Sequence, residues 1–295
     1  MPGKKTDILE TIEAEYERLS PQLRLAARFV LDSPDRVALH SMREIAAQAD
    51  VLPPTMIRLV KRLGFSSYND FRDRFRDRIV PETGTYAARA RQLQLRNSLG
   101  SDTGFLGEMS ETDMRNIEQT FASLEEEAIR TAAQTLIDAK TIYIIGLRKC
   151  FPVAFYIHYA LRNFFPAARL LQGQAGLFRE EISFISGDDA VIVIAFDPYT
   201  KETVRAARSA RDAGGSLIAI TDSVVSPLSD GAEHLFLAAN RSPSFYRSLV
   251  GALAIAQALV AAVVDALGVD AVEKLENSEK RLRRSNTYWQ NGDKS

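Results

Sequence analysis

The hydrophobic pattern of the chain changes along its length. Over residues 1–80, apolar positions recur at helical spacing between short polar joints, and no β-branched run is long enough for a convincing strand. Over residues 81–110 the chain is polar and basic, contains Gly84, Gly100 and Gly104, and has little apolar periodicity. The pattern predicts a small all-α N-terminal unit, followed by a linker with room for one short helix.

Beyond this linker, short apolar runs alternate with helical patterns. The apolar runs lie at 141–146, 190–196, 216–221 and 234–238, and the helical patterns lie at 111–139, 151–165 and 201–213. Short apolar strands separated by helices are typical of a parallel sheet covered on both faces. We therefore expect an α/β doubly wound domain over residues 111–270 and a C-terminal tail over 271–295. Such sheets bind ligands at the carboxyl ends of their strands.

The most apolar run, residues 249–264, bears on whether the chain enters a membrane. The run falls short of the roughly 20 residues that a membrane span needs, and it contains Gln257. Nothing at the N-terminus resembles a cleavable targeting segment. We expect a buried or interface helix here, no membrane partner and a cytoplasmic protein.

Composition narrows the class of protein further. A length of 295 residues is about twice that of a typical single domain, in agreement with two domains. Hydrophobic residues at 46% and charged residues at 25% exclude a disordered or collagen-like chain. Because 37 Lys and Arg nearly balance 38 Asp and Glu, any nucleic-acid site must be regional. A single cysteine and three histidines argue against disulfides and a structural metal, and we expect no cofactor.

Residues 41–65 contain two short helical patterns with a tight joint. Ser41, followed three residues later by Glu44, forms a capping box that starts the first helix. Pro53 suits the first position of the second helix, and Gly64 suits the position just beyond its end. These signals predict a helix-turn-helix, the motif whose second helix enters the major groove of DNA.

The second of these helices has one apolar face and one basic face. Met56, Leu59, Val60 and Leu63 follow helical spacing and are expected to face the core. The residues left on the open side are Pro54, Thr55, Arg58, Lys61 and Arg62. Short polar groups at the start of a recognition helix approach base edges, and Arg or Lys further along reaches guanine or phosphate. The spacing alone also fits an ordinary helical hairpin with a solvated basic face.

The segment 67–79 extends the helical unit. Tyr68, Phe71, Phe75 and Ile79 lie on one stripe and are expected in the core. Arg and Asp alternate around this stripe, which is typical of a solvated, internally paired face. Between residues 51 and 80, seven basic residues against three acidic ones leave a positive surplus that favours phosphate binding.

The two halves of the chain together resemble a known family. The stretch 41–71 is similar to the DNA-binding domain of RpiR-type bacterial transcriptional regulators, which join this domain to a C-terminal SIS (sugar isomerase) domain. The residues that carry the similarity are Glu44, Ile45 and Ala46, then Thr55 and Arg58, then Leu63, Gly64, Phe65 and Phe71. One departure is Leu52, which stands where the family usually has a serine, so a side-chain N-cap is missing. The resemblance implies double-stranded operator DNA as a partner.

The resemblance also implies where a small molecule would bind. SIS domains usually hold a phosphosugar in loops rich in Ser, Thr and Gly, and the loop after the third predicted strand keeps this pattern with Thr221 and Ser226. After the first predicted strand, Arg148 and Cys150 stand where the family commonly has a second glycine and a serine. The loop after the second predicted strand keeps only Thr200 of the usual Ser-rich pattern.

These altered loops favour a different ligand chemistry. Asp197 would repel a phosphate, and Pro198 has no N–H to donate. We expect a small carboxylate, or a metabolite that bears amino or hydroxyl groups, to bridge Arg148 and Asp197. The candidate ligand-binding residues are Arg148, Lys149, Cys150, Asp197, Tyr199, Thr200, Thr221 and Ser226. Two alternatives stay open: Arg148 and Asp197 pair with each other, and Cys150 is either a packed or a reactive thiol.

These features together favour a ligand-responsive transcriptional regulator. A sugar-phosphate isomerase on the same fold is one alternative, but no His, Glu and Ser or Thr set converges on the strand ends, and we expect no catalytic residue. An interaction protein that no longer binds DNA is another alternative. We expect a homodimer or homotetramer, with the apolar helices at 151–165 and 249–264 at its interface.

Overall fold

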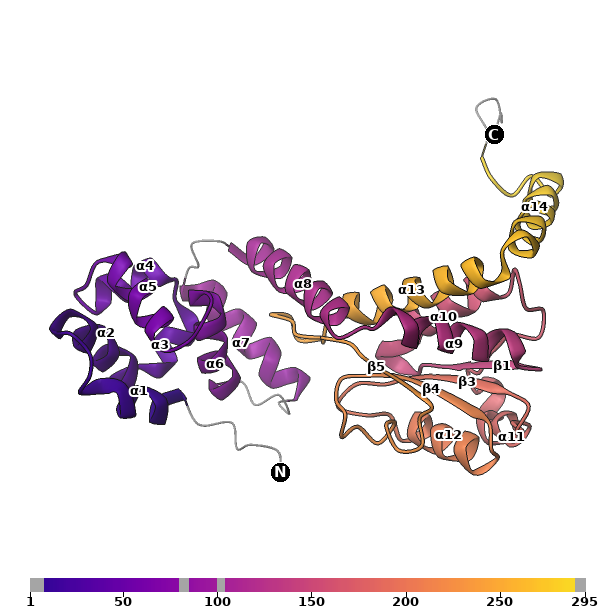
Figure 1. Ribbon diagram of the computed structural model, residues 1–295, viewed down its shortest axis with the longest axis horizontal. Helices are drawn as coiled ribbons and strands as arrows, with labels where there is room; N and C mark the ends of the chain where they lie inside the picture. Colours follow the sequence, from indigo (N-terminus) through magenta and orange to yellow (C-terminus); the bar gives the residue numbers. More distant parts are fainter. Residues whose placement is uncertain (1–7, 80–84, 100–103, 290–295) are drawn as a thin grey trace. The chain divides into compact units, whose positions relative to one another are not determined.

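The computed structural model describes residues 8–79, 85–99 and 104–289, and the chain divides into two compact units. The first unit is formed by the chain up to Met109 with Pro243–Tyr246, and the second by Ser110–Ser242 with the chain from Arg247 onward. Figure 1 shows helices in the first unit and a sheet between layers of helices in the second.

The first unit is a cluster of helices around one core. Its described helices are α1 (Ile8–Tyr16), α2 (Pro21–Asp32), α3 (Pro34–Leu39), α4 (Met42–Gln48), α5 (Pro53–Arg62), α6 (Tyr68–Ile79) and α7 (Tyr86–Leu99). The apolar faces of α1 to α6 form one buried cluster that includes Ile12, Ile45, Met56, Phe71 and Phe75. The predicted all-α unit is confirmed, and the side chain of the fourth stripe residue, at position 79, lies outside the described residues.

The stretch predicted as a linker is more helical than its composition indicates. It contains all 14 residues of α7, and α8 (Gly104–Ala122) begins within it. Thr85 caps α7, because its Oγ1 accepts a hydrogen bond from the Ala88 N–H at 3.2 Å. The Ala, Arg, Gln and Leu residues of α7 also have high helix propensity. Propensity and a cap therefore form a helix where apolar periodicity is weak.

The helix predicted over 111–139 is two helices. α8 ends at Ala122, and α9 (Glu126–Asp138) begins after a short joint. In this joint the Ser123 hydroxyl donates to the Thr120 carbonyl at 2.9 Å. Such local side-chain bonds compete with continuation of the helix.

The second unit is built on a parallel sheet. Its described strands are β1 (Ile142–Ile145), β2 (Arg169–Leu170), β3 (Ala190–Ile194), β4 (Ser216–Thr221) and β5 (His234–Leu237), in the order β2-β1-β3-β4-β5. All of the neighbouring pairs formed by these strands are parallel. The doubly wound α/β fold is confirmed. β2 was not predicted, because its two residues are too few to show a period.

Helices cover both faces of this sheet, which explains why its central strands are apolar throughout. α9, α10 (Phe151–Leu161) and α13 (Val250–Leu267) pack on one face, and α11 (Phe178–Ser183) and α12 (Lys201–Asp212) pack on the other (Figure 1). Among the described helices, only α13 is long and apolar enough to cross a membrane by length and composition. Its Ile255, Leu259 and Val263 are fully buried against the sheet and its neighbours, so one face of this helix belongs to the core.

Most of the predicted C-terminal tail is a helix, α14 (Val269–Arg284). Ion pairs one turn apart join Lys280 to Glu276 at 3.7 Å and Arg283 to Glu279 at 3.5 Å. Pairs at this spacing stabilise a helix by a few tenths of a kcal/mol each. Charge pairing thus supports a helix in a segment that the sequence analysis treated as a polar tail.

Candidate DNA-binding surface and ligand site

The helix-turn-helix forms as the sequence signals predict. Glu44 N donates to Ser41 Oγ at 3.3 Å and Ser41 N donates to Glu44 Oε2 at 2.8 Å, so both bonds of the capping box start α4. α5 begins at Pro53, and Gly64 follows its end with φ of 88°, a conformation that glycine adopts without steric cost.

The buried stripe of α5 is wider than predicted. Met56, Leu59 and Val60 are buried, as their spacing predicts. Thr55 is only 4% exposed, so its predicted place on the open side is wrong. Thr55 lies one turn before Leu59 and shares its buried face. Thr55 Oγ1 instead accepts a hydrogen bond from Arg58 Nη2 at 3.2 Å, which positions the arginine.

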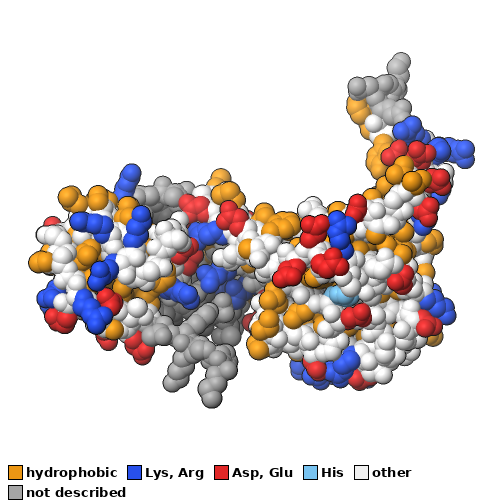
Figure 2. All heavy atoms as spheres, viewed as in Figure 1, with side chains coloured by type: hydrophobic (Ala, Val, Ile, Leu, Met, Phe, Trp, Pro, Cys, Tyr) orange, Lys and Arg blue, Asp and Glu red, His pale blue; other side chains and the backbone are white. Residues whose placement is uncertain are grey.

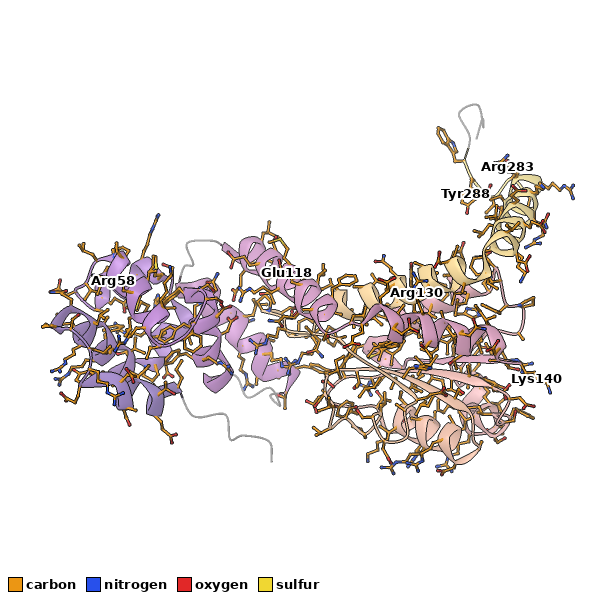
Figure 3. All side chains as sticks on the ribbon, in the orientation of Figure 1. Arg58, Glu118, Arg130, Lys140, Arg283 and Tyr288 are labelled. Atoms are coloured by element: carbon orange, nitrogen blue, oxygen red, sulfur yellow. The ribbon has the colours of Figure 1, made fainter. Side chains whose placement is uncertain are left out.

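The other predicted DNA-binding residues of α5 are exposed: Pro54, Arg58, Lys61 and Arg62. Arg62 Nη2 lies 3.7 Å from Glu15 Oε2 of α1. Exposed pairs of this kind contribute about 0–1 kcal/mol, so a DNA phosphate competes easily for Arg62. Figure 3 labels Arg58 on α5, and Figure 2 shows Lys and Arg side chains beside hydrophobic ones over α4 and α5.

Two apolar side chains that were not among the predicted DNA-binding residues are exposed at this helix. Leu52, the N-cap residue of α5, is 73% exposed, and Ile57 is 41% exposed. A signal was present, because Ile57 falls outside the helical spacing that places Met56 and Leu59 in the core. The open face of α5 is therefore partly apolar.

In the second unit, three loops meet at the carboxyl ends of β1, β3 and β4. The strand register aligns these ends, because Ile145 pairs with Val193 and Ile194 pairs with Ile220. The predicted ligand residues lie in the turn Arg148–Cys150 after β1, in the segment after β3 and in the segment around the end of β4. This edge of the sheet is the candidate ligand site.

Asp222 connects these loops, although the sequence analysis did not single it out. Its Oδ2 accepts a hydrogen bond from the Asp197 backbone N–H at 3.0 Å, and its Oδ1 accepts one from the Tyr199 hydroxyl at 2.7 Å. Lys149 Nζ donates to the Asp197 carbonyl at 2.7 Å. Burial and the bond to Asp222 raise the pKa of Tyr199 to about 12, so the hydroxyl stays protonated at neutral pH. The Asp222 carboxylate thus accepts hydrogen bonds from the Asp197 N–H and the Tyr199 hydroxyl, two donors that would otherwise be open to an anionic ligand.

Thr221 and Ser226 lie beneath the loops and are buried. Thr221 Oγ1 lies 2.9 Å from the Ala195 carbonyl oxygen and 2.8 Å from Ser226 Oγ, which also accepts from the Leu228 N–H at 3.2 Å. These hydroxyls brace the loops from within. Thr200, at the N-cap position of α12, is half-buried and makes no side-chain capping bond.

Cys150 is a packed thiol. Its side chain belongs to the core, with 2% exposure, and burial raises its pKa to about 11. Because the thiolate is the reactive form, a raised pKa suppresses reactivity at neutral pH. Of the two alternatives for this residue, the structure agrees with the packed one.

Arg148 is exposed at the end of β1 and adopts a left-handed backbone with φ of 55°. Across the described residues no ion pair joins Arg148 to Asp197. The site therefore has two cations after β1, the exposed Arg148 and the hydrogen-bonded Lys149, and two carboxylates, Asp197 and Asp222, beyond β3 and β4. No group of three or more metal-ligating His, Cys, Asp or Glu side chains occurs in the part of the chain that the structure describes.

Comparison with known proteins accounts for both units. A family model described as "Helix-turn-helix domain, rpiR family" matches residues 6–81, and one described as "SIS domain" matches residues 135–262. The chain therefore combines an rpiR-family helix-turn-helix domain with a SIS domain. The first match lies in the helical unit and the second in the doubly wound unit.

The chain is similar to two proteins described as a transcriptional regulator or transcription factor, and it shares its fold with a third protein. The regulator HexR of Escherichia coli is 28% identical over 217 residues, which are 73% of this chain and 72% of HexR. The sugar isomerase domain of the RpiR transcription factor from Sphaerobacter thermophilus is 25% identical, with a TM-score of 0.55, and covers 58% of this chain and 96% of its own. Vibrio vulnificus NanR, complexed with ManNAc-6P, shares the fold at 20% identity and a TM-score of 0.55, over 94% of this chain and 98% of its own.

Proposed function

We propose that this regulator binds double-stranded operator DNA through α5, and that a small metabolite at the carboxyl edge of the sheet controls this binding in the cytoplasm. The observation that carries the proposal is the exposed face of α5, on which Arg58 is held by the buried Thr55 hydroxyl. An arginine whose rotamer is fixed by the protein loses less side-chain entropy on contact with guanine or phosphate.

Arg58→Ala is expected to weaken operator binding by about 1–3 kcal/mol without unfolding the protein, because Arg58 is exposed. The measurement is a fluorescence anisotropy titration, over several salt concentrations, with an operator selected from random DNA. Arg205→Ala removes the same charge from the exposed face of α12 and is expected to leave affinity unchanged. Equal binding by Arg58→Ala and the parent at every salt concentration would show that α5 is not the DNA-binding helix.

We infer that the effector is a small carboxylate, or a metabolite with amino or hydroxyl groups, rather than an ordinary sugar phosphate. The Asp197 N–H and the Tyr199 hydroxyl already bind Asp222. Two carboxylates, Asp197 and Asp222, lie at this edge, and they repel the two charges of a phosphate dianion more strongly than the single charge of a carboxylate, which Arg148 alone can neutralise. NanR is complexed with ManNAc-6P, so the fold accepts a phosphate-bearing ligand. The two carboxylates are the feature of this chain that favours a ligand without a phosphate group.

Calorimetry with hexose and pentose phosphates, sugar acids and small hydroxy- or amino-carboxylates tests this inference. A carboxylate ligand is expected to bind the parent and to lose about 1.5–3 kcal/mol of affinity in Arg148→Ala, the usual contribution of a charged hydrogen bond. Arg179→Ala, which removes an exposed arginine from α11, serves as the matched control. Tight binding of common hexose or pentose phosphates, unaffected by Asp197→Ser, would show that the inferred chemistry is wrong.

The regulator is proposed to act as a symmetric dimer or tetramer through the SIS domain. Phe155 and Tyr159 of α10 are 49% and 51% exposed, and their rings stack with centroids 6.2 Å apart. The apolar side chains of α13 are largely used by its own core, so α10 is the better candidate for the interface. Two-fold symmetry would place two recognition helices about 34 Å apart, or a multiple of that, on a palindromic operator.

Phe155→Asp is expected to shift the protein to a monomer at micromolar concentration, because it places a charge in an apolar interface. Light scattering measures the mass, and Phe184→Asp, at a residue that is 71% exposed on another helix end, is expected to keep the parent's mass. A monomeric parent, with and without DNA, would contradict the oligomer proposal.

A catalytic role is not proposed. Isomerisation of a sugar phosphate needs an acid and a base that are free to exchange protons with a substrate. At the edge of the sheet, Tyr199 is a bound donor with a raised pKa, and Lys149 is bonded to the Asp197 carbonyl. HexR, which matches most of this chain, is a transcriptional regulator.

A further inference from the structure

The N-terminal end of α5 is unusual for a helix that is expected to approach DNA. Free backbone N–H groups at a helix start commonly bind phosphate, and a capping hydroxyl commonly approaches bases. Here the first two helical residues, Pro53 and Pro54, have no N–H. Leu52 supplies no capping hydroxyl, and Thr55 is buried with its N–H bonded to the Leu52 carbonyl at 2.8 Å. The N–H groups and the capping hydroxyl that usually contact DNA at a helix start are therefore missing or already hydrogen-bonded.

Apolar side chains take their place. Leu52 is 73% exposed at the tip of the helix, Pro54 is exposed one step later, and Ile57 is 41% exposed on the flank. Arg58 and Lys61 follow within the next turn, and no acidic side chain pairs with either of them in the described residues. The open face of α5 is therefore apolar at its start and basic beyond it.

In the major groove of DNA, one base-edge group is apolar, namely the 5-methyl group of thymine. We propose that Leu52 and Ile57 contact thymine methyl groups in each operator half-site, next to the base pair or phosphate that Arg58 contacts. This inference rests on the proposed DNA-binding function and adds to it the base that the helix start selects. Isolated exposed apolar residues are common on protein surfaces. These two, however, flank the exposed Pro54 on the helix end that a helix-turn-helix directs at base edges.

Substitution of thymine by deoxyuracil tests this proposal, because it removes the methyl group and leaves base pairing intact. The full-length protein first selects an operator from random DNA, and each thymine of that operator is then replaced in turn. The parent is expected to lose affinity roughly fourfold at one or two positions per half-site, which corresponds to burial of one methyl group. Leu52→Ala and Ile57→Ala are each expected to abolish the difference between thymine and deoxyuracil at one of these positions.

Two controls separate this contact from other effects. Leu25→Ala removes a leucine that is 48% exposed on α2 of the same unit, and it is expected to keep the full discrimination of the parent. The thymine effect is also expected to be the same at every salt concentration, whereas Lys61→Ala is expected to reduce the dependence of affinity on salt.

These experiments distinguish failure of the thymine contact from failure of DNA binding itself. Operator binding that deoxyuracil weakens at no position, or discrimination that persists in both Leu52→Ala and Ile57→Ala, would overturn this inference while the DNA-binding function stands. A protein that selects no DNA at all would overturn both. Circular dichroism spectra of the variants that match the parent would confirm that exposed residues were changed without loss of the fold.

Discussion

Phe71→Ala is expected to destabilise the N-terminal helical unit by about 3–5 kcal/mol, a large part of the stability of a small domain. Phe71 has no exposed surface, and its ring centroid lies 5.4 Å from that of Phe65 and 4.9 Å from that of Phe75. Its removal leaves a cavity among aromatic rings that cannot fully close. Because α5 packs on the same core, operator binding is expected to fall with the stability of the unit.

Calorimetry checks this result by following the thermal transitions of the two units. The transition of the helical unit is expected to fall or disappear in Phe71→Ala, and that of the SIS domain is expected to stay in place. Phe184→Ala removes the same atoms from a side chain that is 71% exposed, so it leaves no cavity and is expected to change stability little. Parental transitions and parental DNA affinity in Phe71→Ala would contradict the described core.

Gly251→Ala is expected to destabilise the SIS domain by roughly 1–3 kcal/mol through overpacking. A Cβ at Gly251 would lie 2.5 Å from the Ala239 carbonyl oxygen and 2.6 Å from Thr120 Oγ1. Thr120 is buried and accepts a hydrogen bond from the Ala239 N–H at 3.1 Å, so neither neighbour is free to retreat. Alanine favours a helix over glycine by about 1 kcal/mol, and the clash must exceed this gain.

Urea denaturation of the two variants Gly251→Ala and Gly187→Ala measures the effect. A Cβ at Gly187 would meet its nearest neighbour, the Ala213 carbonyl oxygen, at an ordinary 3.6 Å, so the same substitution is expected to be nearly neutral there. If Gly251→Ala were as stable as the parent, the close approach of α8, α13 and the segment after β5 would be wrong.

Local signals predicted the helix-turn-helix well, but not the width of its buried stripe. The capping box of Ser41 and Glu44 and the position of Pro53 depend on neighbours within one turn, which the sequence displays. Thr55 is buried because α2 and α4 both pack against α5, and two neighbours cover a wider stripe than helical spacing alone predicts. The same contacts leave Leu52 and Ile57 outside.

At the candidate ligand site, the sequence indicated the loops but not the hydrogen bonds between them. The three loops proposed from the sequence follow β1, β3 and β4, and the parallel strands align their carboxyl ends. The central part of Asp222 was not predicted, since its partners Asp197 and Tyr199 lie more than 20 residues away along the chain. The strand register brings the β3 and β4 loops together, and the side chains then choose their hydrogen-bond partners.

The sequence by itself determined the main alternation of helices and strands, the two-part organisation and the basic character of α5. Periodicity, capping and composition act over a few residues, so a single chain displays them directly. Only the tertiary structure decided that Thr55 faces the core while Leu52 faces solvent, that Cys150 is packed, and that Asp222 rather than Arg148 engages the loop after β3. These outcomes depend on which distant segments pack together, because burial and hydrogen-bond partners are set by neighbours in space.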